Sequence, residues 1–384
     1  MSSSNSPAAR LATRLAFWVA GFGVACWAPL VPFAKQRLQI GDGTLGLLLL
    51  CLGIGSVVAM LRTGPLCARH GCKPVILAGG AGLVLLLPAL AWVDAPGLLA
   101  LVLLGFGGAL GSLDVAMNVQ AVEVEREAGR PLMSGFHALF SVGGFSGSAL
   151  MTFLLSLSIS PLASALISSA LMAVGLGLAS PRLLATAPAP SGDLLALPRG
   201  PVLLLAALAA VTFLVEGALL DWSALLLTDS GLTSAAQAGL GYALFSVAMT
   251  VGRFGGDACT ARFGDRAVMG WGGLIAIAGF AILLLASRLG LALTGFVLVG
   301  LGASNVVPVL FRRAGAQREM PAAVAVAAIT TAGYAGYLTG PAAVGFVSKW
   351  AGLPAAFWFL AGLLCLVPML ARRATGAMAA SREN

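Results

Sequence analysis

Residues 105–127, GFGGALGSLDVAMNVQAVEVERE, place a carboxylate inside an otherwise apolar run. On a helix, a stripe about 80° wide carries small residues at one end and polar residues at the other. Its members are Gly107, Gly111, Asp114, Asn118, Ala121 and Glu125. An ionisable group at membrane depth is costly unless it faces a bundle interior or a water-filled cavity. We therefore expect a functional site on this stripe, inside a bundle of membrane helices.

The composition indicates a polytopic membrane protein. Hydrophobic residues make up 59% of the 384 and charged residues 9%, and the mean hydropathy is +0.99, which lies outside the range of soluble domains. The net charge of +8 comes from short basic clusters between apolar runs, a pattern of membrane topology rather than of nucleic-acid binding. Six cysteines without a CxxC pair and two histidines indicate neither a disulfide framework nor a metal site, and no cofactor is expected.

Apolar runs of about 20 residues predict twelve membrane helices in two sets of six. The first set covers 14–34, 43–63, 74–93, 97–121, 131–156 and 161–180, and the second covers 201–227, 235–257, 267–287, 290–311, 321–347 and 353–371. We expect an all-α membrane protein with two pseudo-symmetric six-helix bundles, residues 1–180 and 201–384, joined by a linker at 181–200. Such a layout is typical of transporters whose solute binds near the membrane midplane between the repeats.

The distribution of lysine and arginine predicts the orientation. The side that holds both termini and the linker has 18 of the 22 basic residues, and the other side has only Lys35, Arg37, Arg288 and Lys349. Because cytoplasmic loops are enriched in basic residues, we expect both termini and the linker to be cytoplasmic, in a bacterial inner membrane.

Two loops carry related motifs at equivalent places in the two halves. Residues 64–73 read GPLCARHGCK; residues 253–257 read RFGGD, and residues 262–266 read RFGDR. A glycine turn with fixed charged groups can join neighbouring helix ends and so favour one access state. The proposed cytoplasmic latch comprises Gly64, Arg69, Gly71, Lys73, Arg253, Gly256, Asp257, Arg262 and Gly264. Simple positive-inside anchoring is the alternative, and Ala68 at the acid position predicts a weaker latch in the first copy.

A second embedded carboxylate, Glu216, lies about 22 Å into its helix from the cytoplasmic side, and Asp114 lies about 25 Å into its helix from the other side. No lysine or arginine falls in the core of a predicted span, and a carboxylate buried without a cation tends to take up a proton. We expect both acids, with Asn118, to bind solute or couple protons. A structural ion pair is the alternative for Asp114.

Four further polar candidates each allow two interpretations. Asp221 either belongs to the site or is solvated near the periplasmic end of its helix. Trp222 is either an interfacial belt residue or a platform for a sugar-like ring. His137 either packs between helices or lines the cavity. Asn305, with Pro308 close by, indicates a locally broken helix that serves as a gate or is only a kink.

The two loop motifs resemble the cytoplasmic signature G-x-x-x-D-R-x-G-R-R of the major facilitator superfamily, and the chain is similar to that superfamily over nearly its whole length. Residues 114–118, DVAMN, are similar to the E-T-A-A-N pattern of the fucose/glucose/galactose permeases, in which the acid contacts sugar. The combination of DVAMNVQAVEVE, GFHALFSVGG and EGALLDWSA resembles the bacterial branch that includes MosC and YbjJ. The resemblance implies the major facilitator fold and transport by alternating access.

One departure from the permeases concerns the proton. Those permeases carry an aspartate in the first helix that is thought to handle the proton, and the matching position here is Ala28, beside Trp27. Proton coupling would then fall to Asp114 or Glu216. An aromatic residue at Trp27 also implies a less polar cavity wall.

We expect a secondary active transporter, not an enzyme, that moves a small polar solute such as a sugar or cyclitol with protons. An exporter of amphipathic drugs or metabolites is the alternative, because the predicted cavity is aromatic and apolar. A sensor or an intramembrane enzyme is less well supported, since no nucleophile and base share a helix face. The expected partners are the solute, protons and membrane lipid, without nucleic acid, and the expected state is a monomer.

Overall fold

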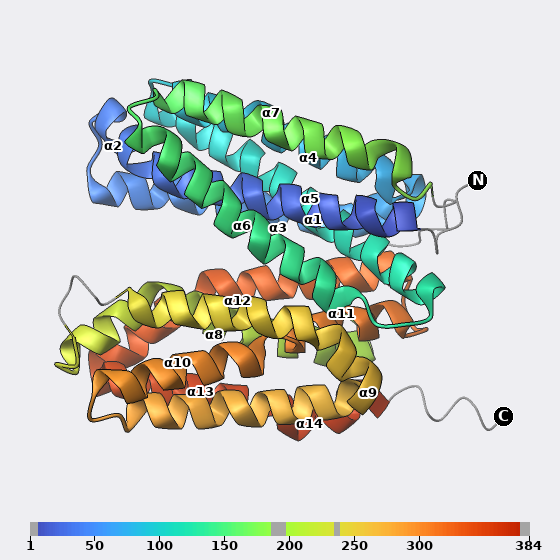
Figure 1. Cartoon of the computed structure of the whole chain (residues 1–384), viewed down its shortest axis with the longest axis vertical. Helices are drawn as coiled ribbons and strands as arrows, with labels where there is room; N and C mark the ends of the chain where they lie inside the picture. Colours follow the sequence, from blue (N-terminus) through green and yellow to red (C-terminus); the bar gives the residue numbers. More distant parts are fainter. Residues whose placement is uncertain (1–6, 186–196, 234–238, 377–384) are drawn as a thin grey trace. The chain divides into compact units, whose positions relative to one another are not determined.

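The computed structural model is built from α-helices, α1 to α14, with two short 3-10 turns (Figure 1). It describes residues 7–185, 197–233 and 239–376. Within these residues, eleven helical stretches are long and apolar enough to cross a membrane. Residues 186–196, most of the predicted linker 181–200, lie outside the described residues.

Helix α9 (Leu240–Leu284) accounts for the difference between eleven stretches and the twelve predicted spans. Of the predicted spans 235–257 and 267–287, residues 235–238 lie outside the described residues. Most of the rest lies in this one 45-residue stretch, which is broken at Gly264 with φ 79° and ψ 161°. A residue with a Cβ rarely adopts this conformation. The two spans therefore run as separate helices on either side of Gly264.

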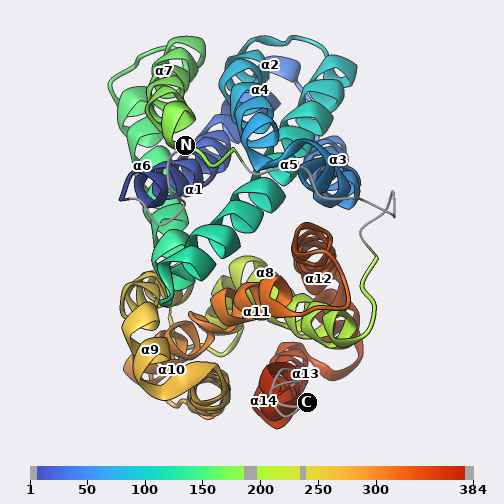
Figure 2. The ribbon, with the colours of Figure 1, turned by 90° about the vertical axis from the view of Figure 1, so that its right-hand side faces the viewer.

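The helices cluster into two compact units. The first unit comprises Met1–Arg130, Phe136–Leu197 and Pro321–Ala328. Its helices are α1 (Pro7–Trp27), α2 (Val31–Leu38), α3 (Asp42–His70), α4 (Cys72–Trp92), α5 (Pro96–Ala128), α6 (Met133–Ser156) and α7 (Pro161–Ala179). Helix α5, which carries the stripe of small and polar residues, packs against α3 and α4 (Figure 2).

The second unit comprises Pro131–Gly135, Pro198–Met320 and Ile329–Asn384. Its helices are α8 (Pro201–Asp229), α9, α10 (Leu289–Ala303), α11 (Val306–Ala316), α12 (Ala322–Ala351), α13 (Leu353–Leu364) and α14 (Leu366–Gly376). This unit also includes the first turn of α6, and the first unit includes the first turns of α12.

Glycines bring helix backbones into direct contact in both units. In the first, a Cβ added to Gly107 of α5 would lie 1.9 Å from the backbone oxygen of Leu52 on α3. In the second, a Cβ added to Gly300 of α10 would lie 2.3 Å from the backbone oxygen of Phe245 on α9. Gly300 lies 193 residues after Gly107, and Phe245 lies 193 residues after Leu52. Small residues permit such close approach between membrane helices.

A second pair of contacts repeats in the same way. Gly143 of α6 meets the backbone oxygen of Trp18 on α1, and Gly336 of α12 meets the backbone oxygen of Ala210 on α8. The glycines are 193 residues apart and their partners 192. The pseudo-symmetry that the loop motifs predict is therefore present in the helix packing of the two units.

Arg37, at the end of α2, caps α4. Its Nε, Nη1 and Nη2 atoms donate to the backbone oxygens of Val93 (2.9 Å), Ala91 (2.7 Å) and Leu90 (2.9 Å). The last carbonyl groups of a helix have no partner within the helix, and a guanidinium group satisfies three of them here.

Candidate functional site

The first unit holds a buried polar pair on α5. Asn118 Nδ2 donates to the backbone oxygen of Asp114 at 2.9 Å and to its Oδ1 atom at 3.3 Å. Both side chains are buried, and within the described residues Asp114 forms no ion pair. Asn118 Oδ1 is buried without a hydrogen-bond partner there. A buried amide oxygen in this position can accept a hydrogen bond from a hydroxyl group.

The other candidates of the first unit, His137 and Trp27, lie on α6 and α1. His137 of α6 meets the Phe17 ring of α1 edge-on, with ring centroids 5.2 Å apart. Trp27 is buried at the end of α1, and its Nε1 atom has no hydrogen-bond partner among the described residues. The ring of His137 thus contacts α1, and a place of His137 in the cavity wall stays a prediction. Trp27 offers a buried donor.

The second unit has a polar cluster of different composition. Glu216 of α8 and Arg253 of α9 interact electrostatically, and Tyr242 of α9 interacts with both. Arg253 is buried. The expectation that the spans lack a basic residue in their core is therefore wrong. Helix α9 continues past the residues expected to start the loop, and so Arg253 faces the bundle interior.

The two tyrosines beside Glu216 were not predicted. Tyr242 forms a side-chain hydrogen bond with Ser246, and Tyr337 of α12 lies within electrostatic reach of Tyr242 and Glu216. Tyr242, Ser246 and Arg253 lie four and then seven residues apart, which places them on one face of α9. That spacing was the signal in the sequence that identifies the cluster.

Asp221 and Trp222 take different positions on α8. Asp221 is exposed, although it lies within electrostatic reach of Tyr242 and Tyr337. Trp222 is half-buried, and its ring is 3.3 Å from the position of a Cβ on Gly345 of α12. The Trp222 ring thus packs against α12.

Asn305 lies at the predicted helix break. Helix α10 ends at Ala303, α11 begins at Val306, and Asn305 between them has φ −110° and ψ 1°. Its Nδ2 atom donates to the backbone oxygen of Gly252 at 3.0 Å and to Ser304 Oγ at 2.9 Å. The break is confirmed, and the Asn305 side chain joins it to α9.

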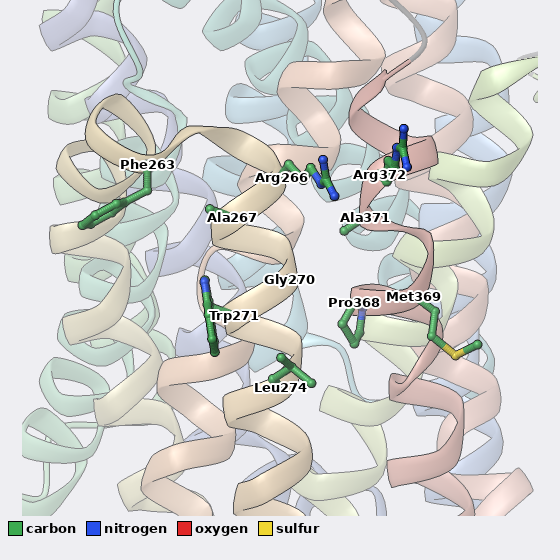
Figure 3. Close-up of a pocket in the computed structure, with 10 residues that line it drawn as sticks. All are labelled: Phe263, Arg266, Ala267, Gly270, Trp271, Leu274, Pro368, Met369, Ala371 and Arg372. Carbon is green, nitrogen blue, oxygen red and sulfur yellow. The ribbon is translucent and has the colours of Figure 1, made fainter.

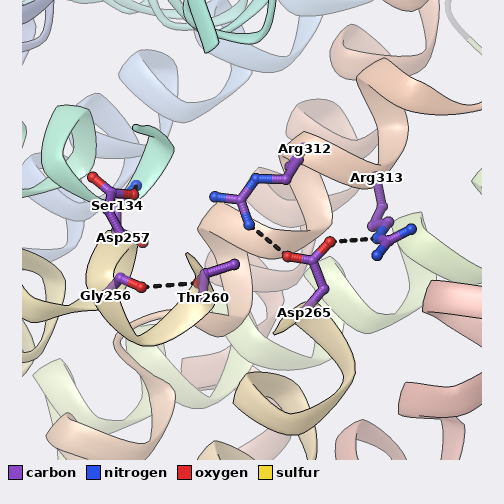
Figure 4. A network of polar contacts seen from close by, with 7 residues as sticks. All are labelled: Ser134, Gly256, Asp257, Thr260, Asp265, Arg312 and Arg313. Carbon is purple, nitrogen blue, oxygen red and sulfur yellow. Dashed lines mark hydrogen bonds and ion pairs between the residues drawn. The ribbon is translucent and has the colours of Figure 1, made fainter. Parts of the chain in front are cut away.

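Asp257 binds the first turn of α6. Its Oδ1 atom accepts from the backbone N–H of Ser134 at 2.9 Å (both residues are drawn in Figure 4). Its Oδ2 atom accepts from the backbone N–H of Gly135 at 2.8 Å. These N–H groups have no partner within the helix, and a carboxylate there also complements the helix dipole. A Cβ on Gly256 would lie 2.6 Å from Ser134 Oγ, so the glycine permits this approach.

A second acidic group of α9 was missed by the sequence interpretation. Asp265 is buried directly after Gly264, and its Oδ1 and Oδ2 atoms pair with Arg312 Nη1 at 2.5 Å and Arg313 Nε at 2.6 Å (Figure 4). An acid beside the turn glycine and a basic pair at the end of α11 were visible in the sequence. Their pairing depends on how α9 and α11 pack together.

The remaining basic latch candidates lie at the surface. Arg69 and Arg262 are exposed and Lys73 is half-exposed, and none of the three forms an ion pair within the described ranges. Arg262 instead lies over the ring of Phe263, 5.3 Å from its centroid.

The two turn glycines fix the correspondence between the motif copies. Gly71 has φ 81° and ψ 163°, nearly the values of Gly264. Asp257 then corresponds to Gly64, and Ala68 corresponds to another alanine, Ala261. The acid position of the signature thus holds an alanine in both copies, and Asp257 lies one helical turn earlier. The weaker latch in the first copy stays a prediction.

Known proteins resemble this chain in sequence and in fold. The model of the Major Facilitator Superfamily matches residues 14–314. An uncharacterized MFS-type transporter of Yersinia pestis is 49% identical over 367 residues, which cover 95% of this chain and 96% of that protein. Membrane protein MosC of Rhizobium meliloti is 28% identical over 362 residues, covering 91% and 86%. The crystal structure of FucP in the outward conformation matches with a TM-score of 0.79 at 18% identity, covering 97% and 99%, and so shares the fold.

Proposed function

The chain belongs to the major facilitator superfamily, and from this premise we propose that it moves a small polar solute, of the sugar or cyclitol class, together with protons. Its membership makes it a multi-pass membrane transporter rather than an enzyme. The resemblances to this superfamily, to MosC and to the fold of FucP are confirmed.

The pair of Asp114 and Asn118 carries the proposal. On α5, the buried carboxylate of Asp114 accepts from the amide nitrogen of Asn118, and the amide oxygen of Asn118 has no partner among the described residues. Together they form a small hydrogen-bonding surface in an apolar surrounding. Such a surface suits vicinal hydroxyl groups, and a pocket that satisfies buried polar groups selects for them. FucP is a fucose:proton symporter, and we extend that class of substrate and that coupling ion to this chain.

Asp114 is the group to which we assign the proton. Glu216 has the positive charge of Arg253 near it, whereas Asp114 has no cation paired with it among the described residues. Ionisable groups at membrane depth that alternate between charged and neutral forms are typical of proton relays. Glu216 and Arg253 then bind or orient the solute, with Trp27 and His137 as parts of the wall.

The orientation and the latch belong to the same proposal. We place the protein in the bacterial inner membrane with both termini and residues 181–200 cytoplasmic, because basic residues concentrate on that side. The six-helix bundles 1–180 and 201–384 alternate in access as a monomer. Asp257, by holding the first turn of α6, stabilises one access state.

Uptake into proteoliposomes tests the proposal. A thermal-shift screen of sugars, cyclitols and hydrophobic cations selects a ligand, because binding to the folded state raises its stability. An inward pH gradient should then drive accumulation of that ligand. Asp114→Asn should abolish the accumulation but leave exchange of the ligand at equal pH intact.

Asp94→Asn is the matched control, because Asp94 is an exposed aspartate between α4 and α5. Normal gradient-driven accumulation by Asp114→Asn would contradict the assignment of the coupled proton to Asp114. Binding of hydrophobic cations alone, with their gradient-driven extrusion, would replace the proposal by the exporter.

A further inference from the structure

A groove on the second unit lies outside the polar clusters. It runs between the part of α9 that follows Gly264 and helix α14, and it has a volume of about 630 Å³ (Figure 3). Arg266 and Arg372 both line one end of the groove, and Leu274 lines the other. Trp271 and Met369 flank it between these ends.

The two arginines leave positive charge at the mouth of the groove. Asp265 precedes Arg266 in sequence, but it is buried and paired with Arg312 and Arg313. Arg266 and Arg372 are exposed, and neither has an ion-pair partner in the part of the chain that the structure describes. An occupant of this end therefore needs negative charge.

The rest of the groove is apolar and open. Trp271 is 67% exposed and Met369 is 73% exposed, although both lie on helices of hydropathy suited to a membrane. The arginines lie near helix ends, since α9 resumes after Gly264 and α14 ends at Gly376. Cations at the membrane boundary, followed by a tryptophan and aliphatic groups, match a molecule with an anionic head and an apolar tail.

The internal repeat indicates that this groove is not a by-product of the fold. The first unit has Lys73 and Ala78 at the positions of Arg266 and Trp271, 193 residues earlier. The contact of Gly273 with Pro368 has its counterpart in Gly80 with Leu176. This correspondence places Ser180 where the second unit has Arg372, so the second arginine and the tryptophan are particular to the second unit.

We propose that this groove binds one anionic phospholipid, with its phosphate held by Arg266 and Arg372 and its glycerol and first acyl carbons against Trp271. Guanidinium groups bind phosphate through two parallel hydrogen bonds, and basic pockets between membrane helices bind anionic headgroups. The open apolar part belongs to helices that are long and apolar enough to cross a membrane, and this favours a lipid with an anionic head over a second protein.

Native mass spectrometry of the full chain in detergent, titrated with phosphatidylglycerol or with phosphatidylcholine of the same acyl chains, tests this inference. The wild type should retain one phosphatidylglycerol at least tenfold more tightly than phosphatidylcholine. Each arginine near a membrane surface contributes about fivefold, so Arg266→Gln with Arg372→Gln should weaken phosphatidylglycerol binding about 25-fold. Trp271→Ala should weaken both lipids without changing the preference between them.

Arg373→Gln is the control, because it removes the same charge one residue away, from a side chain that does not line the groove. Its lipid binding should equal that of the wild type, and the thermal midpoints should show that all variants are folded. Equal retention of the two lipids by the wild type, or unchanged retention by the double variant, would overturn the inference. Glycerol phosphate that displaces phosphatidylglycerol equally well would show an anion site rather than a lipid site.

Discussion

Asp257 holds in the second unit the position that Gly64 holds in the first. Each lies seven residues before a turn glycine with the same backbone conformation. A Cβ on Gly64 would lie 2.5 Å from the Cβ of Ala327, in the first turns of α12, whereas the Asp257 carboxylate binds two N–H groups in the first turn of α6. Equivalent positions of the two units thus contact the start of a helix in different ways. Gly64 packs closely against the start of α12, whereas Asp257 forms hydrogen bonds to the start of α6.

Asp257→Ala should loosen the start of α6. The variant leaves the N–H groups of Ser134 and Gly135 without their carboxylate partner, and hydrogen bonds to charged groups contribute about 1.5–3 kcal/mol each. Hydrogen exchange at these two amides should become about tenfold faster or more. Asp229→Ala, at the exposed end of α8, is the control. Unchanged exchange at Ser134 and Gly135 would refute the latch.

Gly107→Ala and Gly300→Ala should both destabilise the protein. Each added methyl group would meet a backbone oxygen, of Leu52 or of Phe245, and overpacking costs about 1–3 kcal/mol. The thermal midpoint in detergent should fall for both. Gly177→Ala is the matched control, since it lies inside α7 with nothing within 4 Å of the added Cβ, and it should be neutral or stabilising. Equal effects at the three sites would show that packing is not responsible.

Local pattern sufficed to predict much of the fold. The membrane spans follow from the length and polarity of each run, which no distant residue alters. The contact between Asp114 and Asn118 follows from their spacing of four on one helix. The break at Asn305 follows from the nearby proline.

Contacts between helices could not be predicted from local sequence pattern. Arg253 was assigned to a loop because its motif reads as one, and only the packing of α8 against α9 places it near Glu216. Asp265 and Arg312 are 47 residues apart in the chain. Their pairing likewise depends on the register between α9 and α11, which composition and periodicity leave open.

A double-mutant cycle should show strong coupling between Glu216 and Arg253. Arg253→Met introduces the residue that the first unit has at this place, Met60. Removing one charge leaves the other uncompensated, whereas replacing both partners can be nearly neutral. Arg253→Met and Glu216→Gln should each lower the thermal midpoint, and the double variant should recover most of the loss. Additive losses would contradict the electrostatic pairing.

Arg37→Lys should destabilise the protein although it keeps the charge. A lysine cannot present three donors in the planar fork that reaches Leu90, Ala91 and Val93, and each lost hydrogen bond costs about 1 kcal/mol. The thermal midpoint should fall, with faster hydrogen exchange at the end of α4. Arg288→Lys, on the exposed residue before α10, is the control, and an equal fall there would attribute the effect to lysine in general.

Asn118→Ala should weaken solute binding more than it weakens the fold. The substitution removes the donor to Asp114 and the buried Oδ1 acceptor, and one hydrogen bond of about 1.4 kcal/mol corresponds to about tenfold in affinity. KM for uptake should rise about tenfold. Gln120→Ala separates this effect from stability. The Gln120 side chain donates to Thr13 Oγ1 at 2.9 Å and accepts from the backbone N–H of Leu184 at 3.3 Å. The variant should therefore lower the thermal midpoint while KM stays unchanged. A Gln120→Ala variant whose KM rises as much as that of Asn118→Ala would show that loss of helix packing, not loss of a solute contact, explains both.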